Sequence, residues 1–417
     1  MGVSRRGSFT TTACVVGCGP AGAMLGLLLA RAGVEVTVLE KHNDFLRDFR
    51  GDTVHPSTIE VLAELGLAER FLALPHRKVS SIGFVQGGRR VAVADFAGLG
   101  LRFPYIAFVP QGDFLDLLTN EARRYPTFRL LMPAEGYDVL REGERIAGVR
   151  YRDGGGEHEL RAHFTVATDG RHSSIRRAVG LRPHEFGAPM DVLQFRLSRR
   201  EGDPDDGYFI HLERGQIIVV LNRGTYWNIA YVFRKGGYEV LRRTGIRGMR
   251  EAVARLVPFL AARVDELTGF DDTRFLEVRL NRLRRWHLPG LLLIGDAAHA
   301  MSPIGGVGVN LAVQDAVAAA NLLAEPLLRA QHLGEPVPAS AAAAVQRRRW
   351  LPTVATQTGQ RLAQHFGVER SLRGRATPRI ALVTEVPLLA QQLRRLMGRA
   401  IGVGLRPEHV RLPTAAA

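Results

Sequence analysis

Cysteine is nearly absent from this sequence of 417 residues, which contains only Cys14 and Cys18. Two cysteines exclude a disulfide-stapled scaffold and fit a protein that works in a reducing compartment. Cys18 lies inside a glycine turn where small residues are needed, so packing is its expected role. The 13 histidines are scattered, without cysteine partners or an H-E-x-x-H spacing, so no metal site is predicted.

Long apolar runs are also lacking. No stretch supplies the roughly 20 uninterrupted apolar residues that a membrane-spanning helix needs. The first 13 residues, MGVSRRGSFTTTA, carry arginines but not the apolar segment of a secretory leader. We therefore expect a soluble, cytoplasmic protein that is not integral to a membrane, and the length predicts about two domains.

Lysine is scarce as well, although the formal net charge is +15. Arginine replaces lysine along the whole chain, with Lys41, Lys78 and Lys235 as the exceptions, which indicates a composition bias rather than a binding stripe. Basic residues are not interleaved with aromatic ones and form no recognition motif, so nucleic acid is not an expected partner. The positive field would still attract anionic cofactors and substrates.

A glycine turn stands near the N-terminus. Residues 15–41 read VVGCGPAGAMLGLLLARAGVEVTVLEK, with Gly17, Gly19 and Gly22 in the pattern G-x-G-x-x-G between a strand and a helix. The first glycine permits the tight turn, the second lets the backbone approach a pyrophosphate, and the third lets helix and strand pack closely. The helix N-terminus then offers unpaired N–H groups to phosphates.

The second strand of this unit ends in an acid, Glu40, 18 residues after Gly22 (40 − 22). A carboxylate there accepts hydrogen bonds from ribose hydroxyls and repels a 2′-phosphate, which favours FAD or NAD over NADP. The pattern by itself does not separate FAD from NAD. The expected cofactor-binding residues of this unit are Gly17, Gly19, Pro20, Ala21, Gly22, Glu40 and Lys41.

Two further strand-turn segments follow. Residues 161–181, RAHFTVATDGRHSSIRRAVGL, contain Asp169 and Gly170, and residues 290–327 begin GLLLIGDAAHAMSPIGGVGVNLAVQDA and contain Gly295 and Asp296. Each alone is compatible with an ordinary strand followed by a turn, because Asp and Gly are common turn formers. Their order behind the glycine turn is much harder to obtain by chance.

These three segments together resemble the class A flavoprotein aromatic hydroxylases, the para-hydroxybenzoate hydroxylase family. The resemblance implies that the first turn holds the ADP part of FAD, that the DG segment lies near the pyrophosphate and the nicotinamide path, and that the GD segment binds the ribityl chain. By position it assigns Asp169, Gly170, Ser173 and Arg176 to the DG motif, and Gly295, Asp296 and Pro303 to the GD motif. It also implies FAD contacts for Arg50, in RGDTVHPSTIEVLAELGL, and for Gln111, in FVPQGDFLDLL.

The glycine-rich loop after the GD segment carries its own physical argument. Gly305, Gly306 and Gly308 let a backbone approach a planar ring, and Val309 and Asn310 begin the helix that runs through Asp315. A helix N-terminus directed at the flavin N1–C2=O edge would stabilise the negative charge of a reduced flavin. We expect Gly308, Val309 and Asn310 to bind the cofactor, and Pro303 and Gly306 to form the catalytic surroundings of flavin C4a and N1.

The predicted fold class is α/β, a Rossmann-like FAD-binding domain with an inserted antiparallel β-sheet substrate domain and C-terminal helices. Alternating, β-rich runs separated by Gly, Asp and Asn predict the sheet. The expected boundaries are 1–78, 97–181 and 276–330 for the discontinuous FAD-binding domain, 79–96 and 182–275 for the substrate domain, and 331–417 for the helical region.

The sheet supplies the candidate substrate contacts Gln194, Tyr226 and Asn228. Alternation puts Tyr226, Asn228 and Ala230 on one face and Trp227, Ile229 and Tyr231 on the other, and the sequence leaves open which face looks toward the flavin. For His299, three residues after Asp296, a structural hydrogen bond is favoured over catalysis.

The resemblance implies an FAD-dependent monooxygenase. It would use NADH or NADPH and O₂ to hydroxylate or epoxidise an aromatic or polyketide-like small molecule through a flavin C4a-hydroperoxide. The alternatives are an FAD-dependent oxidase, dehydrogenase or reductase that exchanges electrons directly with its substrate, and a nucleotide-binding module without turnover. Activation of a phenol would need a base that the sequence does not identify, and monomer and homodimer are both open.

Overall fold

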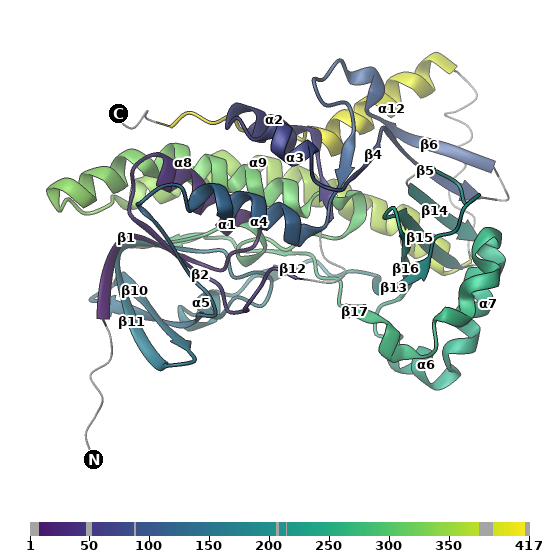
Figure 1. Cartoon of the computed structure of the whole chain (residues 1–417), viewed down its shortest axis with the longest axis horizontal. Coiled ribbons are helices and arrows are strands. Elements are labelled where there is room, and N and C mark those ends of the chain that lie inside the picture. The colour runs from purple at the N-terminus through teal and green to yellow at the C-terminus, as the bar shows by residue number, and fades with distance from the viewer. Residues whose placement is uncertain are drawn as a thin grey trace.

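A Rossmann-like sheet of eight strands forms one end of the elongated molecule (Figure 1). The computed structural model describes residues 8–46, 52–86, 89–205, 208–213, 215–374 and 387–412. The sheet has a parallel core in the order β20-β11-β1-β2-β8, to which β19, β10 and β9 add antiparallel pairs. Its strands are β1 (Ser8–Val16), β2 (Val36–Leu39), β8 (Phe128–Leu131), β9 (Glu135–Glu142), β10 (Arg145–Asp153), β11 (Gly156–Ala167), β19 (His287–Leu288) and β20 (Leu291–Leu293).

Helix α1 (Pro20–Arg31) packs on this sheet beside α4 (Gln111–Ala122) and α8 (Gly308–Leu333). Every residue from Ala21 to Ala30 is buried, which explains why this helix is apolar all round. A Cβ at Gly26 would lie 2.9 Å from the Val38 side chain and 3.0 Å from that of Phe128. The helix therefore lies against β2 and β8 at a distance that only glycine allows there.

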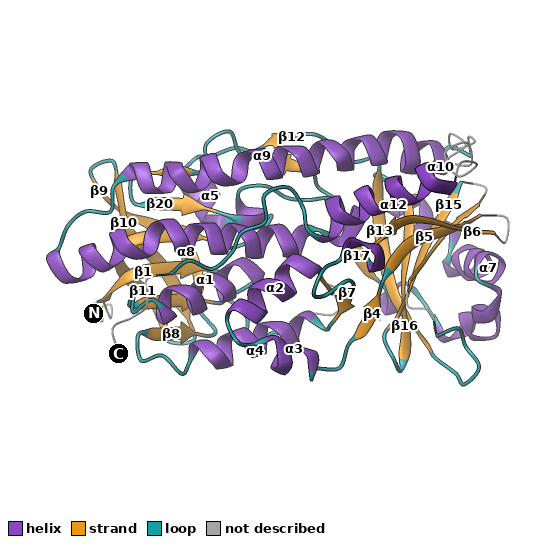
Figure 2. Ribbon diagram, turned by 90° about the horizontal axis from the view of Figure 1, so that it is seen from above, coloured by secondary structure: helices purple, strands orange, loops and turns teal. Residues whose placement is uncertain are grey.

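Two long helices run along the molecule, α8 and α9 (Ala339–Ala363), and Figure 2 shows them side by side. Within the described residues, one helical stretch, Ile304–Leu333, is long and apolar enough to cross a membrane by length and composition. In the most apolar window of that stretch 83% of the residues are buried inside the protein. Its apolar side chains are thus used in packing.

A second sheet, of seven strands, forms the other end of the molecule in the order β17-β13-β16-β15-β14-β5-β6 (Figure 2). All its pairs are antiparallel except β14 with β5, so the sheet is mixed rather than antiparallel throughout. Those two strands are separated by more than a hundred residues of chain, and a long connection allows parallel pairing. The strands are β5 (Ser81–Gln86), β6 (Arg89–Asp95), β13 (Met190–Ser198), β14 (Tyr208–Glu213), β15 (Gln216–Asn222), β16 (Tyr226–Arg234) and β17 (Arg274–Leu276).

The two faces of this second sheet have different neighbours. One face, with Trp227, Ile229 and Tyr231, packs in a hydrophobic cluster with α7 (Ile246–Leu256) and the turns that follow it. The opposite face contributes Val192 and Ala230 to a smaller cluster that also contains Ile304 from the glycine-rich loop. The alternation left open by the sequence is thereby resolved: the face of Tyr226, Asn228 and Ala230 looks toward that loop.

Short elements join the two ends. A three-stranded sheet, β3-β7-β4, lies between them, and α12 packs against β6. A two-residue pair, β12 with β18, closes a loop near the GD segment. The remaining elements are β3 (Thr53–Val54), β4 (Arg77–Val79), β7 (Ile106–Phe108), β12 (His184–Glu185), β18 (Asn281–Arg282), α2 (Pro56–Glu64), α3 (Ala68–Leu72), α5 (Ser174–Ala178), α6 (Tyr238–Thr244), α10 (Arg370–Leu372) and α12 (Pro387–Gly402).

Candidate active site

The glycine turn after β1 is tightly packed on one side and open on the other. A Cβ at Gly22 would lie 1.9 Å from the carbonyl oxygen of Gly17, and a Cβ at Gly17 would lie 2.8 Å from the Cα of Asp169. Gly19 precedes α1 as its N-cap, no side chain caps that terminus, and a Cβ at Gly19 would meet nothing within 4 Å. Open space over an uncapped helix N-terminus suits a phosphate group.

Glu40 stands where β2 ends, and its carboxylate lies against the same turn. It accepts hydrogen bonds from the backbone N–H of Cys18 at 3.0 Å and of His42 at 3.1 Å. Glu40 is buried, whereas the next residue, Lys41, is exposed. The acid is therefore held in one orientation beside the glycine turn.

Asp169 brings the DG segment to this turn. Its Oδ2 accepts the backbone N–H of Ile175, while its Oδ1 is buried and has no hydrogen-bond partner within the described chain. Burial raises the pKa of this carboxyl. An orphaned buried acceptor needs a donor, and the hydroxyls of FAD would supply one, so this side chain fits the cofactor. Gly170 follows with φ of 80°, a conformation that favours glycine.

The DG and GD segments are tied together through Arg176. Ser173 caps the short helix α5 by accepting the backbone N–H of Arg176 at 2.9 Å. The guanidinium of Arg176 donates to the carbonyl of Ala297 at 2.8 Å. Asp296, next to Ala297, lies 3.7 Å from the Nε of Arg171. These contacts place Asp296 beside the turn that follows Gly170.

Gly295 connects the GD segment to two helices. A Cβ at Gly295 would lie 3.4 Å from the Cβ of Ala21, in the first turn of α1, and 3.6 Å from that of Ala312 in α8. With Gly17 against Asp169, this contact means that all three glycine-acid segments converge at the N-terminus of α1. The sequence patterns that predicted a dinucleotide site are thus brought together in space.

A buried network of charged side chains holds the backbone of the GD segment in place. Asp315 accepts the backbone N–H of Gly295 at 3.1 Å, pairs with His299 Nε2 at 2.6 Å, and pairs with Arg349 Nε at 2.9 Å. Arg349 also contacts Glu408 at 3.3 Å. The contacts with His299 and Arg349 oppose the effect of burial and hold the pKa of Asp315 below its usual range. Within the described residues His299 is a structural partner of Asp315, as its position in the sequence suggests.

The glycine-rich loop turns through two residues with positive φ, Gly305 at 78° and Gly306 at 63°. The carbonyl of Gly306 accepts hydrogen bonds from Thr53 Oγ1 at 2.7 Å and from His55 Nε2 at 3.0 Å. Pro303, at the start of the loop, is exposed. The loop is therefore anchored through the Gly306 carbonyl, while Pro303 stays exposed.

Helix α8 begins directly after the loop, at Gly308, without a side-chain cap. Val309 and Asn310 are buried. The side-chain oxygen of Asn310 accepts the hydroxyls of Ser57 at 2.8 Å and Thr58 at 2.7 Å, which ties α8 to α2. The uncapped N–H groups and the positive end of the helix dipole fit an anionic edge of a flavin.

The candidate substrate residues share the sheet face that looks toward this loop. Gln194 pairs in register with Ala230, and Asn228 pairs with Arg196. The Arg196 guanidinium lies 4.7 Å from the centre of the Tyr226 ring, and Arg196 is exposed. Asn228 is buried, and its Oδ1 has no hydrogen-bond partner in the described part of the chain.

Two predicted residues stand apart from these contacts. Arg50 lies outside the described residues. Gln111 is the half-buried first residue of α4 and is followed by Gly112, where a Cβ would lie 3.0 Å from the carbonyl oxygen of Phe45. Its assignment to the ribityl chain stays a prediction.

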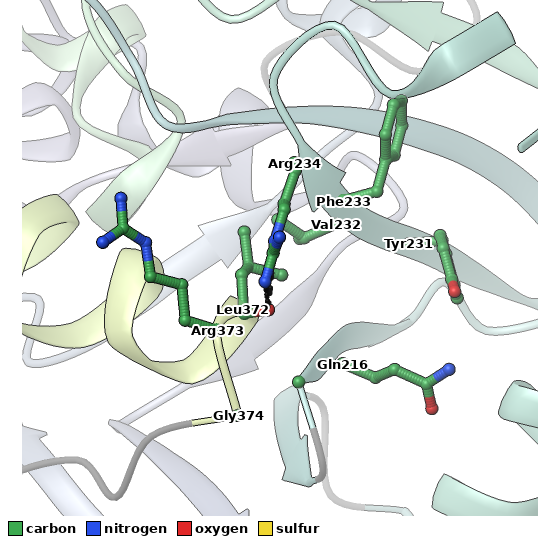
Figure 3. Close-up of a pocket in the computed structure, with 9 residues that line it drawn as sticks. Gln216, Tyr231, Val232, Phe233, Arg234, Leu372, Arg373 and Gly374 are labelled. Carbon is green, nitrogen blue, oxygen red and sulfur yellow. Dashed lines mark hydrogen bonds between the residues drawn. The ribbon is translucent and has the colours of Figure 1, made fainter. Parts of the chain in front are cut away.

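A pocket of about 500 Å³ lies elsewhere, where β15 and β16 meet α10 (Figure 3). In Figure 3 the Arg234 side chain reaches the carbonyl of Leu372, a hydrogen bond of 3.0 Å. The pocket is lined by Tyr231 but by none of the predicted cofactor residues. It is therefore separate from the glycine-acid segments.

Several residues of the site were not identified from the sequence. Asp315 and Arg349 are 34 residues apart along the chain, and their pairing has no sequence pattern. Asp52 and Thr53 lie two and three residues after Arg50, a predicted FAD contact. Their closeness to Arg50 in the sequence is the one signal that could have pointed to them. Asp52 lies 3.6 Å from Arg223, which is on a hairpin of the second sheet.

Comparisons with known proteins agree with this geometry. The family model described as FAD binding domain matches residues 10–333. The chain is 32% identical over 331 residues to 6-methylpretetramide 4-monooxygenase of Streptomyces rimosus, an alignment that covers 76% of each protein. It is 30% identical over 328 residues to rifampicin monooxygenase of Streptomyces venezuelae, covering 72% of this chain but 61% of that protein.

Solved structures show the same fold. A probable FAD-dependent monooxygenase from Pseudomonas aeruginosa superposes with a TM-score of 0.72 at 22% identity, over 88% of this chain and 99% of that one. The anhydrotetracycline hydroxylase OxyS of Streptomyces rimosus gives a TM-score of 0.71 at 21% identity, over 94% of this chain and 76% of that one.

Proposed function

Because this chain belongs to the FAD binding domain family and is an FAD-dependent oxidoreductase related to monooxygenases, we propose that it hydroxylates or epoxidises an aromatic or polyketide-like small molecule with O₂ and NADPH or NADH. The convergence of three glycine-acid segments at the N-terminus of α1 carries the proposal. The segments meet through the close approach of Gly295 to Ala21 and of Gly17 to Asp169. Relatives named 6-methylpretetramide 4-monooxygenase and para-nitrophenol 4-monooxygenase support the substrate class.

The residues of this chain would hold FAD at three places. Gly19 and the first turn of α1 would bind the pyrophosphate, Glu40 the adenosine ribose, and Asp169 and Asp296 the hydroxyls between the pyrophosphate and the ring. Bound there, FAD supplies the transfer of electrons from a nicotinamide to dioxygen and the activation of one oxygen atom for insertion into the substrate.

The surroundings of the ring would come from the glycine-rich loop. The N-terminus of α8 at Gly308 would stabilise negative charge on the ring edge, and the exposed Pro303 would border the reacting face. Thr53 and His55 would keep the loop in place through the Gly306 carbonyl. These side chains orient the ring and exclude water from it.

The substrate would lie between this loop and the second sheet. Residues 79–96 and 182–275 would form the substrate domain, with Gln194, Tyr226 and Asn228 on the face near Ile304. The FAD-binding domain would comprise 1–78, 97–181 and 276–330, followed by the helical region 331–417. We expect the enzyme to work in the cytoplasm as a monomer or homodimer.

The test is anaerobic absorbance spectroscopy of the FAD-loaded protein. NADPH or NADH should bleach the oxidised flavin bands, faster when an accepted aromatic substrate is present, and isotopically labelled dioxygen should then place one labelled oxygen in the product. Direct reduction by substrate without any nicotinamide, with dioxygen recovered as hydrogen peroxide, would replace the proposal by an oxidase. A protein that binds no FAD would overturn it.

A further inference from the structure

Helix α12 carries a row of apolar side chains on its solvent side. Leu393 is 43% exposed, Leu396 66% and Met397 38%. Ala400, one turn further along, is exposed as well. Spacings of three and four residues place all four on one face of the helix. Single exposed leucines need no explanation, but a continuous apolar row along one helix marks an interaction surface.

The opposite face of α12 holds the helix on the second sheet. A Cβ at Gly398 would lie 2.1 Å from the carbonyl oxygen of Asp95, the last residue of β6, and a Cβ at Gly402 would lie 3.0 Å from the Phe96 side chain. Ala390, two turns before Gly398, is buried. The glycines let the helix lie directly on the end of β6. Its apolar row could turn inward only if this packing were lost.

The charge on the exposed side of α12 has a single sign. Arg395 and Arg399 run along one side of the apolar row, both are exposed, and neither has an ion-pair partner within the described residues. The helix, PLLAQQLRRLMGRAIG, contains arginines but no acidic residue. A basic strip beside an apolar strip is typical of a helix that lies in the interface of an anionic membrane.

A second copy of this chain is the other occupant that an apolar row could take. Two α12 helices paired through their rows would bring their arginines together, with no acidic residue on either helix to compensate the charge. The net charge of the whole chain, +15, has the same sign. A surface of opposite charge therefore suits this helix better than a copy of itself.

The C-terminal end of α12 lies beside the glycine-rich loop. His55 Nδ1 lies 2.9 Å from the carbonyl oxygen of Ile401, and His55 Nε2 lies 3.0 Å from that of Gly306. A Cβ at Gly305 would lie 3.9 Å from the Ile401 side chain. Binding through α12 would therefore bring the proposed ring site close to a membrane in which apolar molecules dissolve.

We propose that α12 docks on the surface of an anionic phospholipid bilayer. Leu393, Leu396 and Met397 would enter the outer part of the acyl layer, and Arg395 and Arg399 would contact the headgroup phosphates. The helix would lie in the plane of the interface, because its 16 residues are too few to cross the bilayer. This inference goes beyond the proposed function and does not depend on it.

The first test is flotation of the FAD-loaded protein with vesicles. Wild type should float with phosphatidylcholine vesicles that contain about 30 mol% phosphatidylglycerol, and it should bind about tenfold more weakly to pure phosphatidylcholine. Raising NaCl from about 0.1 M to about 0.5 M should weaken the binding, because salt screens the arginines. A protein that floats with neither kind of vesicle would overturn the proposal.

Leu396→Gln combined with Met397→Gln separates the apolar row from the charge. This variant keeps every arginine, yet it should bind the anionic vesicles about tenfold more weakly than wild type. Its Tm should match wild type, because both side chains are exposed. The control Leu333→Gln replaces a leucine that is 68% exposed at the end of α8, and it should bind as wild type does. An equal loss in the control would refute a specific role for α12.

Arg395→Gln combined with Arg399→Gln tests whether the charge acts locally. This variant should bind the anionic vesicles about tenfold more weakly, because each arginine near the headgroups contributes to the attraction. The control, Arg152→Gln combined with Arg161→Gln, lowers the net charge equally from β10 and β11 at the other end of the molecule (Figure 1). If both variants were weakened equally, net charge alone would explain the binding and the proposal would fail.

Sedimentation velocity without vesicles tests the competing occupant. A wild-type dimer that becomes a monomer in the Leu396→Gln, Met397→Gln variant, and that ignores anionic vesicles, would assign the row to a second copy and refute membrane docking. Reduction of FAD by NADPH in the same samples keeps the proposed function separate. Normal reduction without vesicle binding refutes the membrane surface alone, and vesicle binding without reduction refutes the proposed function alone.

Discussion

Asp315 accepts the backbone N–H of Gly295 at 3.1 Å, so a side chain of helix α8 sets the position of the GD turn. The Asp315 carboxylate is shielded from solvent, because it is fully buried between His299 and Arg349. The backbone of the predicted cofactor site thus depends on a charged network that lies behind it. Loss of a partner of Asp315 should therefore lower both the stability of the fold and the affinity for FAD.

Arg349→Met should destabilise the fold by about 3–5 kcal/mol, because it leaves the buried charges of Asp315 and Glu408 without their common partner. Urea unfolding measures this loss, and the FAD content of the purified protein should fall with it. Arg247→Gln, which removes an exposed pair with Glu251 on α7, should change stability by less than about 0.5 kcal/mol. Equal stability of the two variants would contradict the network.

Two alanine substitutions in the glycine turn should have opposite outcomes. Gly22→Ala places a Cβ 1.9 Å from the Gly17 carbonyl and should prevent stable folding. Gly19→Ala meets no protein atom within 4 Å, so the fold should keep its Tm without FAD. The added methyl group should nevertheless weaken FAD binding at least tenfold, measured by quenching of flavin fluorescence. Unchanged affinity in Gly19→Ala would place the pyrophosphate elsewhere.

Asp52→Asn should stabilise the protein at alkaline pH and not at acid pH. The folded state raises the pKa from 3.8 to about 6, so the unfolded state loses its proton first, and wild-type stability falls as pH rises through that window. The shift of roughly two units corresponds to about 3 kcal/mol. Denaturant titrations should show no difference between variant and wild type near pH 4 and the full gain by pH 8.

Asp203→Asn is the control with the opposite sign. Hydrogen bonds from Arg263 hold the pKa of Asp203 well below its usual range, so its ionised form stabilises the fold above the ordinary pKa. This variant should lose stability at pH 8, where Asp52→Asn gains it. If both asparagine variants changed stability in the same direction at pH 8, the raised pKa of Asp52 would be refuted.

His55 should limit stability on the acid side. Burial lowers its pKa from 6.5 to about 4, so it stays neutral in the folded state while the unfolded chain takes up a proton. Stability contributed in this way is complete above pH 6.5 and is lost as pH falls toward 4, by about 3 kcal/mol. Replacement by glutamine should flatten the stability curve between these values, whatever its effect at pH 7.

Much of the cofactor half could be predicted from the sequence, because the requirements there are local. A glycine turn such as Gly17 to Gly22 and an acid such as Glu40 need only a fixed spacing within one strand-helix-strand unit. The family match confirms FAD, and the geometry brings the DG and GD segments to the same helix N-terminus.

The orientation and contacts of the second sheet could not be predicted from the sequence in the same way. Alternation along β16 defined two faces, but only the packing of Trp227 under α7 decides which face is covered. The pairing of Asp52 with Arg223 joins residues that are far apart along the chain, and no periodicity encodes it. Long-range charge pairs of this kind arise from tertiary structure alone.

His55 Nδ1 lies 2.9 Å from the carbonyl oxygen of Ile401, the Ser57 hydroxyl lies 3.2 Å from that of Gly402, and Glu408 contacts Arg349. The contacts that hold the glycine-rich loop and the GD turn therefore include residues near the C-terminal end of the described chain. Ile401, for example, is made 346 residues after its partner His55. During synthesis the nucleotide turn can form early, but the ring site stays incomplete until residue 408 has left the ribosome. Cofactor binding in its final geometry consequently requires the chain to be made through residue 408.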